Sequence, residues 1–125
     1  MEYLLMERTA CFGKCPVYAI ELFKDGTIAY TGKRFVEDSG KYEKNIGKAA
    51  VEKIFQQFMT LRADTCRASY DLLIADLPGI NYHYNINGEE RKISNATFGP
   101  SYLRELAADI DSLGYGSHKG WKKIQ

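Results

Sequence analysis

The chain has 125 residues, 45% of them apolar and 26% charged, and its formal net charge is +1. This length and apolar content predict one folded domain, residues 1–125, and exclude an intrinsically disordered chain. No apolar run approaches the ~20 residues of a membrane-spanning helix, so we expect no transmembrane segment. The balanced charge lacks the basic excess of proteins that grip a phosphate backbone, so no nucleic-acid partner is expected.

The first part of the chain predicts four strands. Apolar runs and alternating patterns indicate strands over residues 3–9, 17–24, 27–33 and, after a turn at 38–40, residues 41–46. Asp25-Gly26 predicts a tight hairpin between the second and third strands. The first strand is largely apolar, which is typical of a central strand or one covered on both faces.

The hydrophobic period then changes to that of a helix. Apolar side chains recur at helical spacing over residues 51–61 and predict an amphipathic helix of about four turns, with Val51, Ile54, Phe55, Phe58 and Leu61 on its core face. Residues 62–78 have no regular pattern and are predicted to form a loop. Residues 80–86 alternate as in a half-buried strand, and Asn87-Gly88 predicts a hairpin that returns along residues 91–96.

A second helix is predicted near the C-terminus. Gly99-Pro100 opens it, because Pro suits the first helical position, and Gly114 is expected to cap its end. Its core face is predicted to hold Leu103, Leu106, Ala107, Ile110 and Leu113. A basic tail, residues 115–125, follows. The element order ββββ-α-ββ-α predicts an α+β fold, a mainly antiparallel sheet with two helices packed on one face.

Two cysteines four residues apart form the most specific local pattern. Cys11 and Cys15 flank Gly13, and Pro16 follows directly, between two predicted strands. Pro16 fixes its own φ and disfavours helix at Cys15, so we expect a tight loop that holds both sulfurs nearby. With three cysteines in the chain, at most one internal disulfide forms and one thiol stays free.

Several roles remain open for Cys11 and Cys15. The pair serves either as a disulfide staple, worth about 2 kcal/mol for so small a ring, or as two reduced and partly buried thiols. A redox role is the second alternative, because Arg8 and Lys14 supply positive charge nearby. Against that role, the spacing is not Cys-x-x-Cys and no helix N-terminus follows the first cysteine.

Metal binding is a third alternative. The further candidate ligands are Cys66, His83 and His118, but a structural zinc site normally takes two closely spaced pairs and the sequence has only one. We therefore expect no metal and no other cofactor. The sequence also lacks a Gly-x-Ser-x-Gly elbow, a His-Glu-x-x-His pair and a phosphate-binding Gly-rich loop, so we expect no catalytic residues and a non-enzymatic domain.

The run from Arg8 to Tyr18 has the form Arg-x-x-Cys-Phe-Gly-x-Cys-Pro-x-Tyr. It resembles the signature of a family of bacterial domains of unknown function. In that family a Gly-x-x-x-Tyr-x-Gly element follows, and Gly26, Tyr30 and Gly32 match it; a later Asp-x-Pro step is similar at Asp76 and Pro78. The family has no assigned activity, so the resemblance implies a domain and not a function.

The localisation depends on the N-terminus. The first eight residues have neither a basic region nor an adequate apolar core for a signal peptide, which predicts a cytoplasmic protein if Met1 is the native start. Members of the similar family are often exported or lipid-anchored, which implies an extracytoplasmic protein if an export signal has been trimmed away.

Aromatic residues supply the remaining candidates. Tyr82 and Tyr84 alternate along one strand, as do Tyr18 and Tyr30 on an earlier pair, and such residues either pack in the core or line a ligand groove. In the tail, Trp121 lies among lysines; an anionic surface is one possible partner, but we expect Trp121 to fold back onto the sheet.

The leading hypothesis is a small non-catalytic binding or interaction domain for an unknown small ligand or protein partner. In this hypothesis, the loop of Cys11 and Cys15 is structural. The alternative is a thiol-redox or metal-binding protein that uses the same two cysteines.

Overall fold

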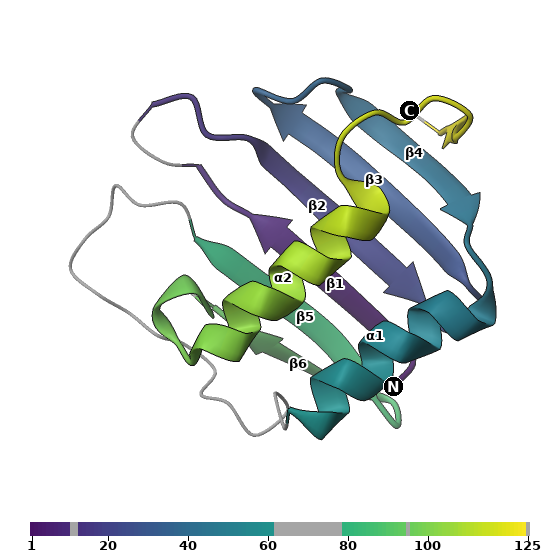
Figure 1. Cartoon of the computed structure of the whole chain (residues 1–125), viewed down its shortest axis with the longest axis vertical. Coiled ribbons are helices and arrows are strands. Elements are labelled where there is room, and N and C mark those ends of the chain that lie inside the picture. Colours follow the sequence, from purple (N-terminus) through teal and green to yellow (C-terminus); the bar gives the residue numbers. More distant parts are fainter. Residues whose placement is uncertain (11–12, 62–78, 95, 125) are drawn as a thin grey trace.

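The computed structural model describes residues 1–125 except 11–12, 62–78, 95 and 125 (Figure 1). The first half of the chain forms β1 (Tyr3–Arg8), β2 (Val17–Phe23), β3 (Thr27–Arg34), β4 (Gly40–Asn45) and α1 (Lys48–Thr60). The second half forms β5 (Ile80–Ile86), β6 (Glu89–Ile93), the short 3-10 helix η2 (Ala96–Phe98), α2 (Ser101–Gly114) and β7 (Lys122–Lys123).

All strands belong to one antiparallel sheet in the order β6-β5-β1-β2-β3-β4-β7. β1 is central, between β2 and β5. The predicted α+β class and the order ββββ-α-ββ-α are confirmed. β7 was not predicted, because a strand of two residues carries no periodicity; it pairs with β4 and ties the tail to that edge.

Both helices pack on the same face of the sheet, crossing over the strands (Figure 1). As predicted, the side chains that they bury recur at helical spacing: Val51, Ile54, Phe55 and Phe58 from α1, and Leu103, Leu106, Ala107 and Ile110 from α2. Alternate residues of the strands meet them, including Leu4, Met6, Ile20, Leu22 and Ile28. Each large apolar side chain buried in this way contributes about 1.5–3 kcal/mol to folding.

Both predicted hairpins are present, but the prediction for Gly114 was wrong. Gly114 does not cap α2 in a left-handed conformation; it is the buried last residue of the helix, and the extended Tyr115 follows it. A Cβ atom at Gly114 would lie 3.1 Å from side-chain atoms of Ile20 and Ile28. The glycine therefore allows α2 to approach the sheet closely. Pro100 also stands one position earlier than predicted, as the N-cap residue.

The second face of the sheet is covered by no helix in the described part of the chain (Figure 1). Long charged side chains lie across its small central residues, and two ion pairs, Lys33–Glu7 and Lys41–Glu21, each reach across one intervening strand there. We call it the open face. The predicted loop 62–78, with Cys66, Asp76 and Pro78, and residue Cys11 lie outside the described residues.

Candidate functional site

Arg8 and Tyr18 come from opposite ends of the cysteine segment and meet on one carboxylate. They are register partners where β1 and β2 begin to separate. Arg8 donates to Oδ2 of Asp111 through Nε (3.0 Å) and Nη2 (2.6 Å), and the Tyr18 hydroxyl donates to Oδ1 at 2.6 Å. We call this cluster the Asp111 anchor, because it fastens the last turn of α2 to the sheet beside the cysteine loop.

The Asp111 anchor keeps its two donors, Arg8 and Tyr18, protonated. Burial raises the pKa of the Tyr18 hydroxyl, and the hydrogen bond to Asp111 raises it further, so Tyr18 remains a neutral donor. Burial alone would lower the pKa of Arg8, but the hydrogen bond and negative charge of Asp111 outweigh it and leave the pKa raised. The side chains of Arg8 and Asp111 are 27% and 20% exposed. A phenol that keeps its proton and a carboxylate that is ion-paired with a guanidinium suit positioning, not proton transfer.

Cys15 is half-buried and disulfide-bonded. The alternative in which it is a reduced thiol is therefore wrong.

The start of the cysteine loop is bonded to the segment that leads into β5. Thr9 donates its backbone N–H to the Gly79 carbonyl (3.0 Å), and Gly79 N–H donates to Thr9 Oγ1 (2.9 Å). Two neighbouring residues therefore hold the N-terminal end of the loop: Arg8 bonds Asp111 and Thr9 bonds Gly79.

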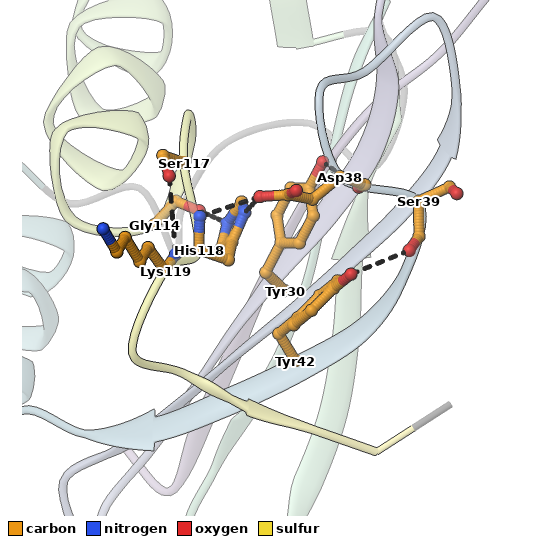
Figure 2. Close-up of polar contacts among 8 residues, drawn as sticks. All are labelled: Tyr30, Asp38, Ser39, Tyr42, Gly114, Ser117, His118 and Lys119. Atoms are coloured by element: carbon orange, nitrogen blue, oxygen red, sulfur yellow. Dashed lines mark hydrogen bonds and ion pairs between the residues drawn. The ribbon is translucent and has the colours of Figure 1, made fainter.

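A second cluster forms where the loop between β3 and β4 meets the tail (Figure 2). The Tyr30 hydroxyl donates to the Asp38 carbonyl (3.0 Å). Burial raises the pKa of Tyr30 to about 12, so this hydroxyl keeps its proton. A Cβ atom at Gly32 would lie 2.1 Å from the same carbonyl oxygen, so only glycine lets the loop pass here. Tyr30 and Gly32, the last two positions of the Gly-x-x-x-Tyr-x-Gly element, thus shape the position of Asp38.

Asp38 in turn holds His118, which is 4% exposed (Figure 2). One carboxylate oxygen, Oδ2, accepts from the His118 backbone N–H (2.7 Å) and faces ring Nδ1 at 2.8 Å. Ring Nε2 faces the Gly114 carbonyl at 2.7 Å. Both ring nitrogens therefore face oxygen atoms. The hydrogen bonds from His118 lower the pKa of Asp38. We call this cluster the Asp38 anchor.

Three tyrosines on neighbouring strands underlie both clusters. Tyr18, Tyr30 and Tyr42 lie side by side on β2, β3 and β4, with ring centroids 5.9 and 6.3 Å apart, and we call them the tyrosine row. Tail residues stack on this row: Tyr115 lies 4.3 Å from Tyr18, and His118 lies 3.7 Å from Tyr30.

Trp121 extends the stacked layer. Its ring stands edge-on to His118 at 4.8 Å, and the Lys44 ammonium lies 5.5 Å from its centroid. Trp121 is partly buried against the core while Lys122 and Lys123 are exposed. The expectation that Trp121 folds back onto the sheet therefore agrees with the structure.

A depression of about 280 Å³ opens on the opposite side of the sheet. Apolar, cationic and acidic side chains from β1, β5 and β6 line it, namely Tyr3, Leu5, Glu7, His83, Tyr84, Glu90 and Arg91. Glu7 is engaged by Lys33 and Asn81, and the Tyr3 hydroxyl donates to Glu21 at 2.7 Å. His83 and Glu90 make no hydrogen bond to another described side chain.

A family model described as a domain of unknown function, DUF6438, matches residues 2–114. The chain belongs to this family. A comparison with curated proteins gives no match. The DUF6438 match contains the whole Asp111 anchor and the tyrosine row, and it ends at the last residue of α2. His118 and the rest of the stacked tail follow after it.

Within the DUF6438 fold, the two tyrosines predicted as candidates on β5 lie in the core. Tyr82 is fully buried and its hydroxyl donates to the Leu103 carbonyl, and Tyr84 packs 4.8 Å from the Phe58 ring. Among the predicted site residues that the structure describes, Arg8 and Tyr18 are the two brought together on a shared partner. Cys15 lies at the loop that connects them, and Cys11 is outside the described residues.

Sequence reasoning missed Asp111 and Asp38, and it named His118 only as a candidate metal ligand. One signal was available for Asp111, because it lies four residues after the buried Ala107 and eight after Leu103, where a carboxylate needs a partner.

Among the described residues, no three His, Cys, Asp or Glu side chains gather as a metal-ligand set. No helix in that part of the chain has the length and apolar content to cross a membrane.

Proposed function

We propose that this DUF6438 chain is a small non-catalytic binding domain, and that the depression on the open face holds its ligand. The observation that carries the proposal is the lining of this depression: it combines an apolar floor with charged groups of both signs on a sheet face that no described helix covers. Concave sites with a few convergent polar groups are where small ligands bind.

The lining also suggests the chemistry of the ligand. Tyr3 and Leu5 offer apolar contact, His83 presents a ring nitrogen and Glu90 presents an acceptor, while Arg91, which is ion-paired with Glu89 at 3.1 Å, adds positive charge. A small zwitterionic molecule, an amino acid or a dipeptide, can satisfy both signs of charge at once. In contrast, the ionisable groups of the cysteine segment, Arg8 and Tyr18, are engaged with Asp111 and are not available for chemistry.

The test is a titration of ¹⁵N-labelled protein with free amino acids and dipeptides. At about 10 mM, a ligand with a Kd of about 1 mM still nearly saturates its site. We expect the amide signals of Leu5, His83 and Glu90 to move, and Glu90→Gln to weaken the response. Lys41→Ala, on the same face but near the opposite edge, is the matched control and leaves it unchanged. If none of the probes moves these amides, the depression is not the ligand site.

We further propose that the domain works in an oxidising compartment outside the cytoplasm and that Cys15 pairs with Cys11. The disulfide at Cys15 supports the first point, because such bonds persist mainly in oxidising environments. The short loop between β1 and β2 supports the second. Alkylation of natively purified protein followed by intact mass measurement is expected to detect one free thiol. Three alkylated cysteines would contradict both points.

We also infer that the family shares the run from Arg8 to Tyr18 and is bacterial. The convergence of Arg8 and Tyr18 on Asp111 supports the first point, because the two ends of the run bond the same carboxylate. The bacterial origin depends on the sequence resemblance alone. An alignment of members tests both points: Arg8 and Tyr18 should vary together with Asp111.

A further inference from the structure

We propose that the tyrosine row and Asp38 form a peptide-binding groove, separate from the open-face depression. Its ligand is a peptide with the pattern Tyr-x-x-His-x-x-Trp that turns between the His and the Trp, and this chain's own tail, Tyr115 to Ile124, occupies the groove in the structure. The groove lies along β4 on the helix-covered side of the sheet. The inference is that the tail is an exchangeable ligand and not a fixed part of the fold.

The tail makes the main-chain contacts of an added strand. β7 pairs with the edge strand β4, with Lys123 opposite Tyr42 and Lys122 opposite Glu43. Ile124 N–H donates to the Lys41 carbonyl at 2.7 Å. Proteins that bind peptides at a sheet edge obtain affinity from such main-chain hydrogen bonds and specificity from pockets for individual side chains.

The side chains of the tail supply the specific part. Tyr115, His118 and Trp121 are spaced by three residues: the first two rings stack on Tyr18 and Tyr30, and the third meets His118 edge-on. The residues between them, Ser117, Lys119 and Gly120 among others, are mostly exposed. The hold on the tail is therefore concentrated in three rings, as in a short recognition motif.

His118 is the side chain that the groove selects most strictly. Its ring fits between the Asp38 carboxylate and the Gly114 carbonyl, two acceptors on opposite sides, while its face lies on Tyr30 (Figure 2). A flat ring with a nitrogen atom on each side meets all three demands. Tyr115 and Trp121, by contrast, make mainly ring contacts.

The family match separates the groove from its occupant. Tyr18, Tyr30, Tyr42 and Asp38 all lie within residues 2–114, whereas Tyr115 to Ile124 lie after the matched region. The groove is therefore part of the DUF6438 domain, and the tail is an addition that fills it. Because a tethered ligand has a high effective concentration, a free peptide competes poorly until the tail is released.

The experiment uses the full chain with the substitutions His118→Ala and Trp121→Phe. The first removes the central contact of the tail, and the second removes the only tryptophan of the protein. Faster trypsin cleavage after Lys119 and Lys122 checks that the tail is released, and circular dichroism checks the fold. The probe is a synthetic peptide of residues 115–125, whose Trp121 then provides the only tryptophan fluorescence.

We expect saturable binding of this peptide with a blue shift of its fluorescence. The same peptide with His118→Ala should bind at least about tenfold more weakly, because its Asp38 and Gly114 contacts are lost. Asp38→Asn in the protein should weaken binding of the native peptide as well. The matched control Asp109→Asn, on the exposed side of α2, should not. Absence of binding, or equal binding of both peptides, would overturn the proposal.

A second measurement covers the case in which the double variant does not fold. A protease site placed at Gly116 in the otherwise native chain allows the tail to be cut after folding. The cut tail should stay associated on native mass spectrometry and be displaced by an excess of the 115–125 peptide, but not by its His118→Ala form. A cut tail that dissociates at once at about 100 μM protein, or that the native peptide does not displace, would contradict the proposal.

Discussion

The Asp111 anchor and the Asp38 anchor both join two parts of the chain through a carboxylate, but the carboxylate comes from opposite partners. In each, one carboxylate contacts a basic side chain and accepts a hydrogen bond from a second donor beside the tyrosine row. In the Asp111 anchor the carboxylate comes from α2 and the basic side chain, Arg8, from the sheet. In the Asp38 anchor the carboxylate comes from the loop between β3 and β4 and the basic side chain, His118, from the tail.

This difference determines what each anchor stabilises. The Asp111 anchor joins two parts of the DUF6438 domain that are also joined by the buried face of α2, so its loss affects the whole fold. The Asp38 anchor joins the domain to a segment with few other buried contacts, so its loss should free that segment alone. Substitutions can test whether the two anchors behave in these two ways.

The largest expected effect is that of Asp111→Ala. It leaves the Arg8 guanidinium and the Tyr18 hydroxyl, both largely buried, without their shared acceptor. We expect the free energy of unfolding to fall by about 2–3 kcal/mol, measured by urea denaturation. Asp109→Ala, two residues away, removes an exposed carboxylate that accepts a hydrogen bond from Gln57; it is the control and should change the free energy of unfolding by less than about 0.5 kcal/mol. Equal losses from both variants would mean that the anchor adds no stability.

His118→Ala should have a local effect. The tail loses the ring that stacks on Tyr30 and bonds Asp38, so Trp121 becomes solvated. We expect a red shift of tryptophan fluorescence and roughly tenfold faster trypsin cleavage in the tail, while the urea midpoint moves less than in Asp111→Ala. His83→Ala, at the other histidine, should change neither readout. Global unfolding in His118→Ala would show that the tail is an integral part of the domain.

The fold could be predicted because its signals are local. Alternation gave the strands, the spacing of Val51 to Phe58 gave α1, and Asp25-Gly26 and Asn87-Gly88 gave the hairpins. Gly114 shows the limit: a glycine at a helix end ordinarily indicates a cap, but here the neighbouring Ile20 and Ile28 require it. Nothing within a few residues of Gly114 carries that information.

The site could be predicted only in part, for the same reason. The sequence singled out Arg8 and Tyr18, but their partner lies 103 and 93 residues away along the chain. His118 and Asp38 are 80 residues apart, and an isolated histidine in a basic tail resembles a solvated side chain. Which carboxylate meets which donor depends on how α2 crosses the sheet, and that is a property of packing and not of local pattern.

A smaller effect is expected for Tyr18→Phe. The substitution removes one hydrogen bond to Asp111 Oδ1 but keeps the ring that stacks on Tyr115, and Arg8 still bonds Oδ2. We expect a loss of about 1 kcal/mol in urea denaturation. Tyr3→Phe provides the matched comparison, because its hydroxyl bonds the Glu21 carboxylate on the open face. A loss in Tyr18→Phe as large as in Asp111→Ala would mean that Arg8 contributes nothing to the anchor.

The smallest effect is expected from acid, which should release the tail before it unfolds the domain. The contacts with His118 lower the pKa of Asp38 below that of an unfolded aspartate, about 3.9, so this carboxylate stabilises the bound tail above that pH. As the pH falls through the lowered pKa, Asp38 takes up a proton and the stabilisation is lost. We expect Trp121 fluorescence to shift red below about pH 4 before the far-ultraviolet circular dichroism changes.

Asp38→Asn should remove this early step, because its amide has no proton to gain in that range. If the fluorescence and the circular dichroism change together in the native chain, the tail and the domain unfold as one unit, and the Asp38 anchor belongs to the fold as fully as the Asp111 anchor does.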